Sequence, residues 1–110
     1  MLTIKSTKIV YFDIDNTLAT WKGFEYYPHS GYVRLLKQFK IRGHTTVVWS
    51  AGGAEWAEIV INKFGLSEYV DLIISKPDWY ADDLRSEEFL PEINRIFLPE
   101  QVLESKEGEK

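Results

Sequence analysis

The chain contains no cysteine among its 110 residues. This absence excludes a disulfide-stabilised scaffold, and it also excludes thiolate nucleophiles and thiolate metal sites. Histidine is scarce too, since His29 and His44 are the only two. Because the sequence offers no third nitrogen ligand, we do not expect these histidines to form a zinc site.

Long hydrophobic runs are also missing. No stretch approaches the length of a membrane span, and residues 1–10 (MLTIKSTKIV) lack the apolar segment of a signal peptide. We therefore expect a soluble, intracellular protein of the cytoplasm. The formal net charge of −4 does not favour sequence-independent nucleic-acid binding, which needs a basic surface. A nucleic acid is expected only as a phosphorylated substrate.

The composition is that of a single folded domain. Apolar side chains make up 45% of the chain, which is enough for one hydrophobic core at this length. We assign residues 1–98 to this domain. Residues 99–110 are charged and lack periodicity, so we expect them to form a flexible tail.

Short apolar runs alternate with segments of helical periodicity. The predicted elements are strands at 8–13, 44–49, 70–74, 79–81 and 95–98, and helices at 31–42 and 54–64. Such alternation predicts an α/β fold with a mostly parallel sheet covered on both faces. Residues 19–30 are rich in aromatic side chains and contain Gly23 and Pro28, which predicts a loop or a small hairpin.

The segment FDIDNTL, residues 12–18, carries two carboxylates at the end of the first predicted strand. In an extended chain Asp13 and Asp15 point the same way, while Ile14 turns back toward the core. Two converging acids form a seat for a hard cation such as Mg²⁺, or a pair of nucleophile and proton donor. A solvated turn after a strand is the simpler alternative, because Asp, Asn and Thr are ordinary turn residues.

Two further polar residues follow predicted strands. Ser50 ends the second strand, and Lys76 lies just past the third. Sheets of this kind place their sites beyond the carboxyl ends of the strands. We therefore expect Asp13, Ser50 and Lys76 to converge on one edge of the sheet.

These segments together resemble the haloacid dehalogenase (HAD) superfamily. FDIDNTL is similar to its Asp-x-Asp-x-Thr motif, the run TTVVWS ending at Ser50 to the second motif, Lys76 to the third, and Asp82-Asp83 to the fourth. The resemblance covers roughly residues 8 to 84. It implies a three-layer, Rossmann-like sheet of about five strands flanked by helices, without a cap domain.

The resemblance also implies a role for each residue in a Mg²⁺-dependent phosphatase. Asp13 would be the nucleophile that forms an aspartyl-phosphate, and Asp15 the general acid and base. Ser50 and Lys76 would bind the phosphate together with backbone amides near Ala51 and Gly52. The metal ligands would be Asp13, Asp15 (through its backbone carbonyl), Asp82 and Asp83.

The chain departs from the family pattern in two places. Lys76 precedes Asp82 by only six positions, whereas a crossover to a parallel neighbour normally takes a dozen or more residues. Six extended residues reach about 20 Å, so we expect residues 77–83 to cross the rim with a very short or absent fourth strand. The chain also has no room for a cap, and aromatic residues 21–29 are expected beside the site.

Three other functions were considered. A catalytically idle module that binds phosphate or metal and regulates a partner has the same motifs. Dehalogenation uses the first aspartate, but the second carboxylate, Asp15, suits phosphoryl chemistry better. A phospho-receiver domain needs its acceptor aspartate after the third strand, where the chain offers only Asp71 near the start of that strand. A phosphorylated small molecule or macromolecule is thus the expected partner, and the sequence indicates no oligomeric state.

Overall fold

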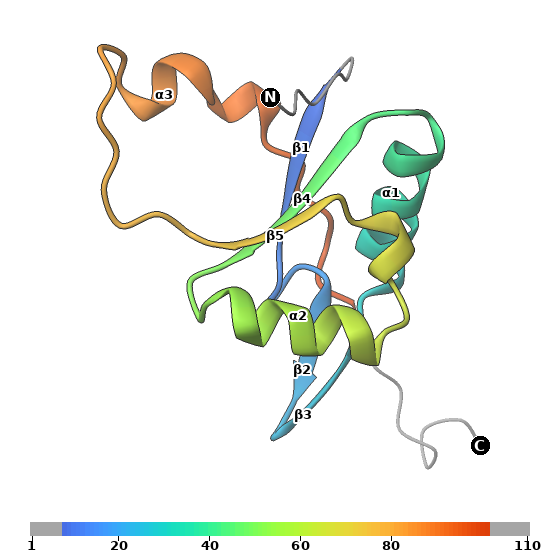
Figure 1. Cartoon of the computed structure of the whole chain (residues 1–110). Helices are drawn as coiled ribbons and strands as arrows, with labels where there is room; N and C mark the ends of the chain where they lie inside the picture. Colours follow the sequence, from blue (N-terminus) through green and yellow to red (C-terminus); the bar gives the residue numbers. More distant parts are fainter. Residues whose placement is uncertain (1–7, 102–110) are drawn as a thin grey trace, which may run out of the picture.

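The computed structural model of the chain describes residues 8–101, so the predicted tail lies outside the described residues from position 102 onward. Figure 1 shows the arrangement of the elements. The elements are β1 (Ile9–Asp13), β2 (Ala19–Lys22), β3 (Glu25–Pro28), α1 (Ser30–Ile41), β4 (Thr45–Ser50), α2 (Ala54–Lys63), η1 (Ser67–Tyr69), β5 (Leu72–Ser75), α3 (Ser86–Phe89) and η2 (Glu92–Asn94).

Three parallel strands form the main sheet in the order β1-β4-β5. The expected α/β class with a parallel sheet is therefore confirmed. Strands β2 and β3 form a separate antiparallel hairpin where the sequence predicted a loop or small hairpin. The three main strands and the two long helices lie within one or two residues of their predicted positions.

Helices α1 and α2 cover one face of the sheet because their apolar sides meet the same strand residues. Phe12 of β1 lies opposite Val48 of β4, and Val48 lies opposite Ile73 of β5. Residues of both helices join this row in one buried cluster. Its fully buried or nearly buried members are Phe12, Ile14, Leu18, Ala19, Tyr32, Leu36, Val48, Ala57, Val60, Ile61 and Leu66. This packing fixes how the three strands are aligned along their length, and therefore where their carboxyl ends lie.

The opposite face of the sheet carries apolar side chains that remain open to solvent. Ile9, Tyr11 and Leu72 are 58%, 45% and 44% exposed. Tyr11 and Leu72 both lie across from Val47, so they share a face that α1 and α2 do not cover. Residues 8–101 thus form two layers, where three were expected.

The described part of the chain forms no strand at 79–81 or at 95–98, so the sheet has three strands instead of about five. The physical reason is the short spacing after β5, because six residues are too few to descend and return. Residues 77–94, here called the arm, instead leave the end of β5 and loop away from the sheet, carrying α3 (Figure 1).

After the arm, the chain returns and attaches to the start of α1. The Leu98 side chain packs on the core, and its amide donates to the Tyr32 hydroxyl at 2.8 Å. His29 caps α1 by accepting from the Tyr32 amide through Nδ1, and its Nε2 lies 3.0 Å from the Pro99 carbonyl. The Gln101 side chain accepts from the Ser30 amide at 2.6 Å. Contacts with the start of α1 therefore continue past residue 98, the predicted end of the domain, as far as Gln101.

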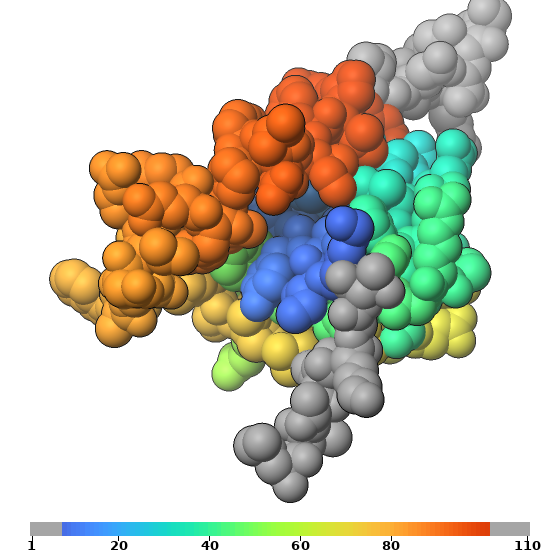
Figure 2. Space-filling view, turned by 90° about the horizontal axis from the view of Figure 1, so that it is seen from above, coloured from blue at the N-terminus to red at the C-terminus, as the bar shows by residue number. Residues whose placement is uncertain are grey.

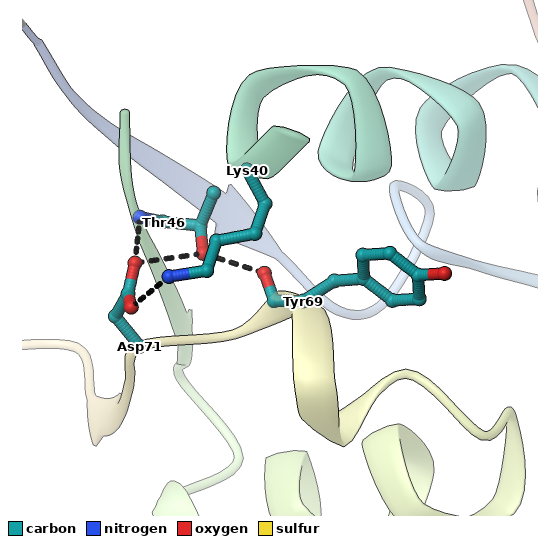
Figure 3. A network of polar contacts seen from close by, with 4 residues as sticks. All are labelled: Lys40, Thr46, Tyr69 and Asp71. Carbon is teal, nitrogen blue, oxygen red and sulfur yellow. Dashed lines mark hydrogen bonds and ion pairs between the residues drawn. The ribbon is translucent and has the colours of Figure 1, made fainter. Parts of the chain in front are cut away.

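A network of one ion pair and several hydrogen bonds joins Lys40 of α1 to Thr46 of β4 and to Asp71, the residue before β5 (Figure 3). The Lys40 ammonium donates to the Asp71 carboxylate at 2.5 Å, and the Thr46 amide donates to the same carboxylate at 2.9 Å. Burial alone would raise the pKa of Asp71, but the hydrogen bonds from Lys40 and Thr46 and the Lys40 charge outweigh it and hold this pKa below its ordinary value. The network therefore stabilises the fold only while Asp71 is ionised.

Asp71→Ala should lower the free energy of unfolding at neutral pH by about 1–3 kcal/mol, because the Thr46 amide and the Lys40 ammonium lose their acceptor. Since the folded pKa is depressed, this contribution is fully present above the ordinary aspartate pKa of about 3.9 and fades as pH falls through the folded value. Urea unfolding of both proteins from pH 7 to pH 2.5 tests this. Asp78→Ala, at an exposed acid of the arm, is the control. A difference that stayed constant to the lowest pH would contradict the assignment.

Candidate active site

The turn after β1 brings the two motif aspartates together. The amides of Thr17 and Ala19 both donate to the Ile14 carbonyl, and Asn16 adopts a positive φ of 64°. Asn tolerates this left-handed conformation better than most residues. Ile14 is fully buried, as predicted, so the flanking carboxylates of Asp13 and Asp15 face the opposite side.

Both carboxylates line one pocket of about 360 Å³, together with Asn16 and Thr17 of the same turn. The pocket is at the lower end of the range for small-molecule sites. Its opposite wall comes from α1 and from the returning chain, namely Tyr32, Arg95, Ile96 and Phe97. The site is thus closed by residues about 80 positions apart in sequence.

Lys76 follows the end of β5 and reaches Asp13 across β4, which lies between β5 and β1. Its ammonium lies 3.6 Å from the Asp13 carboxylate and 5.5 Å from the centre of the Trp49 ring. The Lys76 amide also donates to the Ser50 carbonyl at 2.9 Å, which holds the residue at the end of β4. The predicted proximity of Asp13 and Lys76 is therefore present. Both side chains are about one-third exposed, so a charged ligand can reach them.

Ser50 lies at this edge but is turned inward. It is 1% exposed, and its hydroxyl accepts from the Gly52 amide at 3.0 Å. The Ala54 amide, at the start of α2, donates to the Ser75 hydroxyl at 2.8 Å. Two amides that could face a phosphate near Ala51 thus already have hydroxyl acceptors. Ser50 therefore closes the turn between β4 and α2 by accepting a hydrogen bond, and its hydroxyl can still donate one to a ligand.

The acids of the fourth motif lie apart from the other site residues. Asp82 and Asp83 are exposed on the arm, and the Asp82 carboxylate accepts from the Leu84 amide at 2.9 Å. Neither residue lines the pocket of Asp13 and Asp15. Within residues 8–101, no group of three or more histidine and acidic side chains is placed to hold a metal ion. The expected four-acid cluster is thus not assembled in this structure.

The residues of the pocket still fit one Mg²⁺ ion. Mg²⁺ prefers oxygen ligands and is commonly held by one or two carboxylates, with waters and substrate oxygens completing its shell. Asp13 supplies a carboxylate that is partly balanced by Lys76, and Asp15 lines the same pocket, with its backbone carbonyl as the expected metal ligand. The donor set therefore suits a weakly held, water-rich Mg²⁺ ion, not a closed protein cage.

The β2–β3 hairpin contacts the site through Trp21. The indole Nε1 of Trp21 donates to the Asp15 carboxylate at 3.0 Å. Its ring stacks on Trp56 of α2, with centroids 6.2 Å apart and planes 24° apart, and it contacts Tyr26 at 5.0 Å. The predicted position of the aromatic segment beside the site is therefore correct for Trp21. Phe24, at the tip of the hairpin, is completely exposed.

Sequence reasoning missed several residues of this site. Ser75 followed a predicted strand and could have been identified as a cap for α2. For the hydrogen bond from Trp21 to Asp15, the sequence indicated only that an aromatic segment would lie beside the site. Nothing in the local sequence placed Arg95 and Phe97 in the pocket, since residues 95–98 were predicted to extend the sheet.

Comparison with known proteins places the chain in one family. The family model described as "Protein of unknown function (DUF705)" matches residues 1–105, and the chain belongs to this family. No curated protein matches the chain. In residues 8–101, no helix combines the length and apolar character needed to cross a membrane.

Tyr32→Phe should loosen the far wall of the pocket. The variant keeps the ring contact with His29 but removes the acceptor of the Leu98 amide, at a cost of about 1 kcal/mol. We expect a lower melting temperature and faster hydrogen exchange at the amides of residues 95–98. Tyr80→Phe is the matched control, because the Tyr80 hydroxyl accepts from the exposed Ser86 amide at 3.2 Å and water can replace it. Equal exchange in both variants would contradict this role for Tyr32.

Proposed function

We propose that this protein is a Mg²⁺-dependent phosphomonoesterase of the haloacid dehalogenase type. The observation that carries the proposal is the grouping of Asp13, Asp15 and Lys76. The two carboxylates share one pocket, and an ammonium group lies 3.6 Å from the first of them. A structural turn does not need this arrangement, because two acids that face one space repel each other unless cations offset them.

Asp13 is the nucleophile in this proposal. One of its carboxylate oxygens attacks the phosphorus of the substrate, the bond to the leaving oxygen breaks, and an aspartyl-phosphate forms. Asp15 gives its proton to the leaving oxygen and later takes a proton from the attacking water, which releases phosphate and restores Asp13. Trp21 holds the Asp15 carboxylate in place through its indole N–H. Lys76 balances the charge that gathers at Asp13.

Mg²⁺ would be held by Asp13 and Asp15, and when bound it supplies positive charge that offsets the anionic phosphoryl group. Ser50 keeps the β4–α2 turn in shape through its bond to Gly52. Residues 8–101 supply three parallel strands and the two helices that cover one face, which supports the proposal as a reduced form of this superfamily's fold.

A catalytically idle module that binds phosphate or metal is the alternative. The intact first motif and the partial exposure of Asp13 and Lys76 favour the enzyme, because a regulatory site has no need for both a nucleophile and a proton donor. The two functions differ in one measurable property, which is turnover.

Purified protein should hydrolyse para-nitrophenyl phosphate in millimolar Mg²⁺ and lose this activity in EDTA. Asp13→Asn should lower kcat by at least about a thousandfold, because an amide is a poor nucleophile and the covalent step fails. Asp78→Asn, at the exposed acid of the arm, should retain full activity. Turnover that survives Asp13→Asn would remove Asp13 as the nucleophile. Absence of turnover on a panel of nucleotides, sugar phosphates, phosphopeptides and phosphorylated oligonucleotides would favour the idle module.

The double variant Asp82→Asn/Asp83→Asn tests whether the arm contributes to metal binding. Both acids lie outside the pocket of Asp13 and Asp15, so we expect the variant to keep the Mg²⁺ requirement of the parent protein for half-maximal activity. It should also keep the rise in melting temperature on adding Mg²⁺. A requirement raised at least about tenfold would mean that the arm supplies metal ligands. An unchanged requirement would mean that Asp13 and Asp15 suffice.

A further inference from the structure

Arg95 is the only cationic side chain among the residues that line the pocket of Asp13 and Asp15, all of which lie in the described range 8–101. It lies beyond the four motifs, and no role was expected for it. Lys76, just after β5, pairs with Asp13 but does not line this pocket. The two cations therefore approach the site from different sides.

Two nearby residues of the same segment contact the Arg95 guanidinium. Its guanidinium lies 4.8 Å from the centre of the Phe97 ring and 3.3 Å from the Glu92 carboxylate. Three residues further on, Leu98 is held by the core and by its bond to Tyr32. Figure 2 shows the red end of the described chain packed beside the blue β1 and against the teal α1. The arginine is therefore presented by an anchored segment.

The positive charge of Arg95 is not neutralised by the acids of the pocket. Among the described residues, ion pairs join Asp13 to Lys76 and Arg95 to Glu92, and none joins Arg95 to Asp13 or Asp15. Glu92 is 81% exposed, so its pair with Arg95 is screened by water and contributes little. Arg95 lines the same pocket as Asp13 and Asp15, and its side chain is 59% exposed, so its guanidinium is open to a ligand with negative charge.

We propose that Arg95 binds a second anionic group of the substrate, and that the substrates are small phosphomonoesters that also carry a carboxylate or a second phosphate. The planar guanidinium matches carboxylate and phosphate oxygens in a two-point hydrogen bond. The phosphoryl group lies at Asp13, which is the part that rests on the proposed function. Ile96 and Phe97 contact the carbon skeleton between the two anionic groups.

The test compares two ligands that differ in one charge, phosphoglycerate and glycerol phosphate. Binding is measured by calorimetry in Mg²⁺ on the Asp13→Asn variant, which does not turn over. We expect phosphoglycerate to bind at least about tenfold more tightly, since a charge-assisted hydrogen bond is worth about 1.5–3 kcal/mol. Adding Arg95→Gln should abolish this preference, and Arg95→Lys should restore part of it.

Arg85→Gln is the matched control. Arg85 forms the same type of ion pair, to Glu88 three residues away at 3.7 Å, but it lies on the arm outside the pocket. The preference should persist in this variant. A preference that survives Arg95→Gln, that is lost equally in Arg85→Gln, or that is absent from the parent protein would overturn the assignment.

The outcomes separate this inference from the proposed function. Arg95-dependent preference in a protein that hydrolyses no phosphomonoester would support Arg95 as an anion-binding residue and reject the phosphatase. Asp13-dependent hydrolysis with no effect of Arg95→Gln on the ratio of kcat/KM for the two ligands would support the phosphatase and reject the role of Arg95.

Discussion

The parallel register of β1, β4 and β5 holds the candidate site together. Asp13 lies opposite Trp49, Trp49 lies opposite Ile74, and Lys76 follows two residues later. This alignment brings an aspartate and a lysine 63 positions apart in sequence to within 3.6 Å. A shift of one residue in either pairing would turn Phe12 and Val48 away from the helices, so burial of the core also fixes the site. The proximity of Asp13 and Lys76 therefore depends on the pairing of three short strands.

Much of this scaffold could be predicted because its signals are local. Apolar runs identified β1, β4 and β5, and the spacing of Ala57, Val60 and Ile61 identified α2. The rule that parallel strands place their carboxyl ends together then predicted the proximity of Asp13 and Lys76. The start of α1 lies one residue before its predicted position. His29 caps the helix, and its ring is also held by Pro99 from the far end of the chain.

The positions of the residues after β5 could not be predicted, because they depend on the path of the arm. Residues 79–81 and 95–98 have the composition of strands, but strand pairing needs a partner edge and a path that reaches it. The short spacing after Lys76 removes that path, and it leaves Asp82 and Asp83 on the arm, apart from Asp13. The same route brings Arg95 into the pocket, which no local pattern indicated. Contacts that join the two ends of the chain are the hardest to infer from sequence.

The arm is attached at both ends, through the Lys76 amide to β4 and through Leu98 to α1. Because the entropy of closing a loop grows only slowly with its length, added residues between these anchors would cost the fold little. Insertions at this position would lengthen the segment that leads into Arg95 on the wall of the pocket. The protein thus has a place where the length of the chain can change in evolution without any rebuilding of the strands.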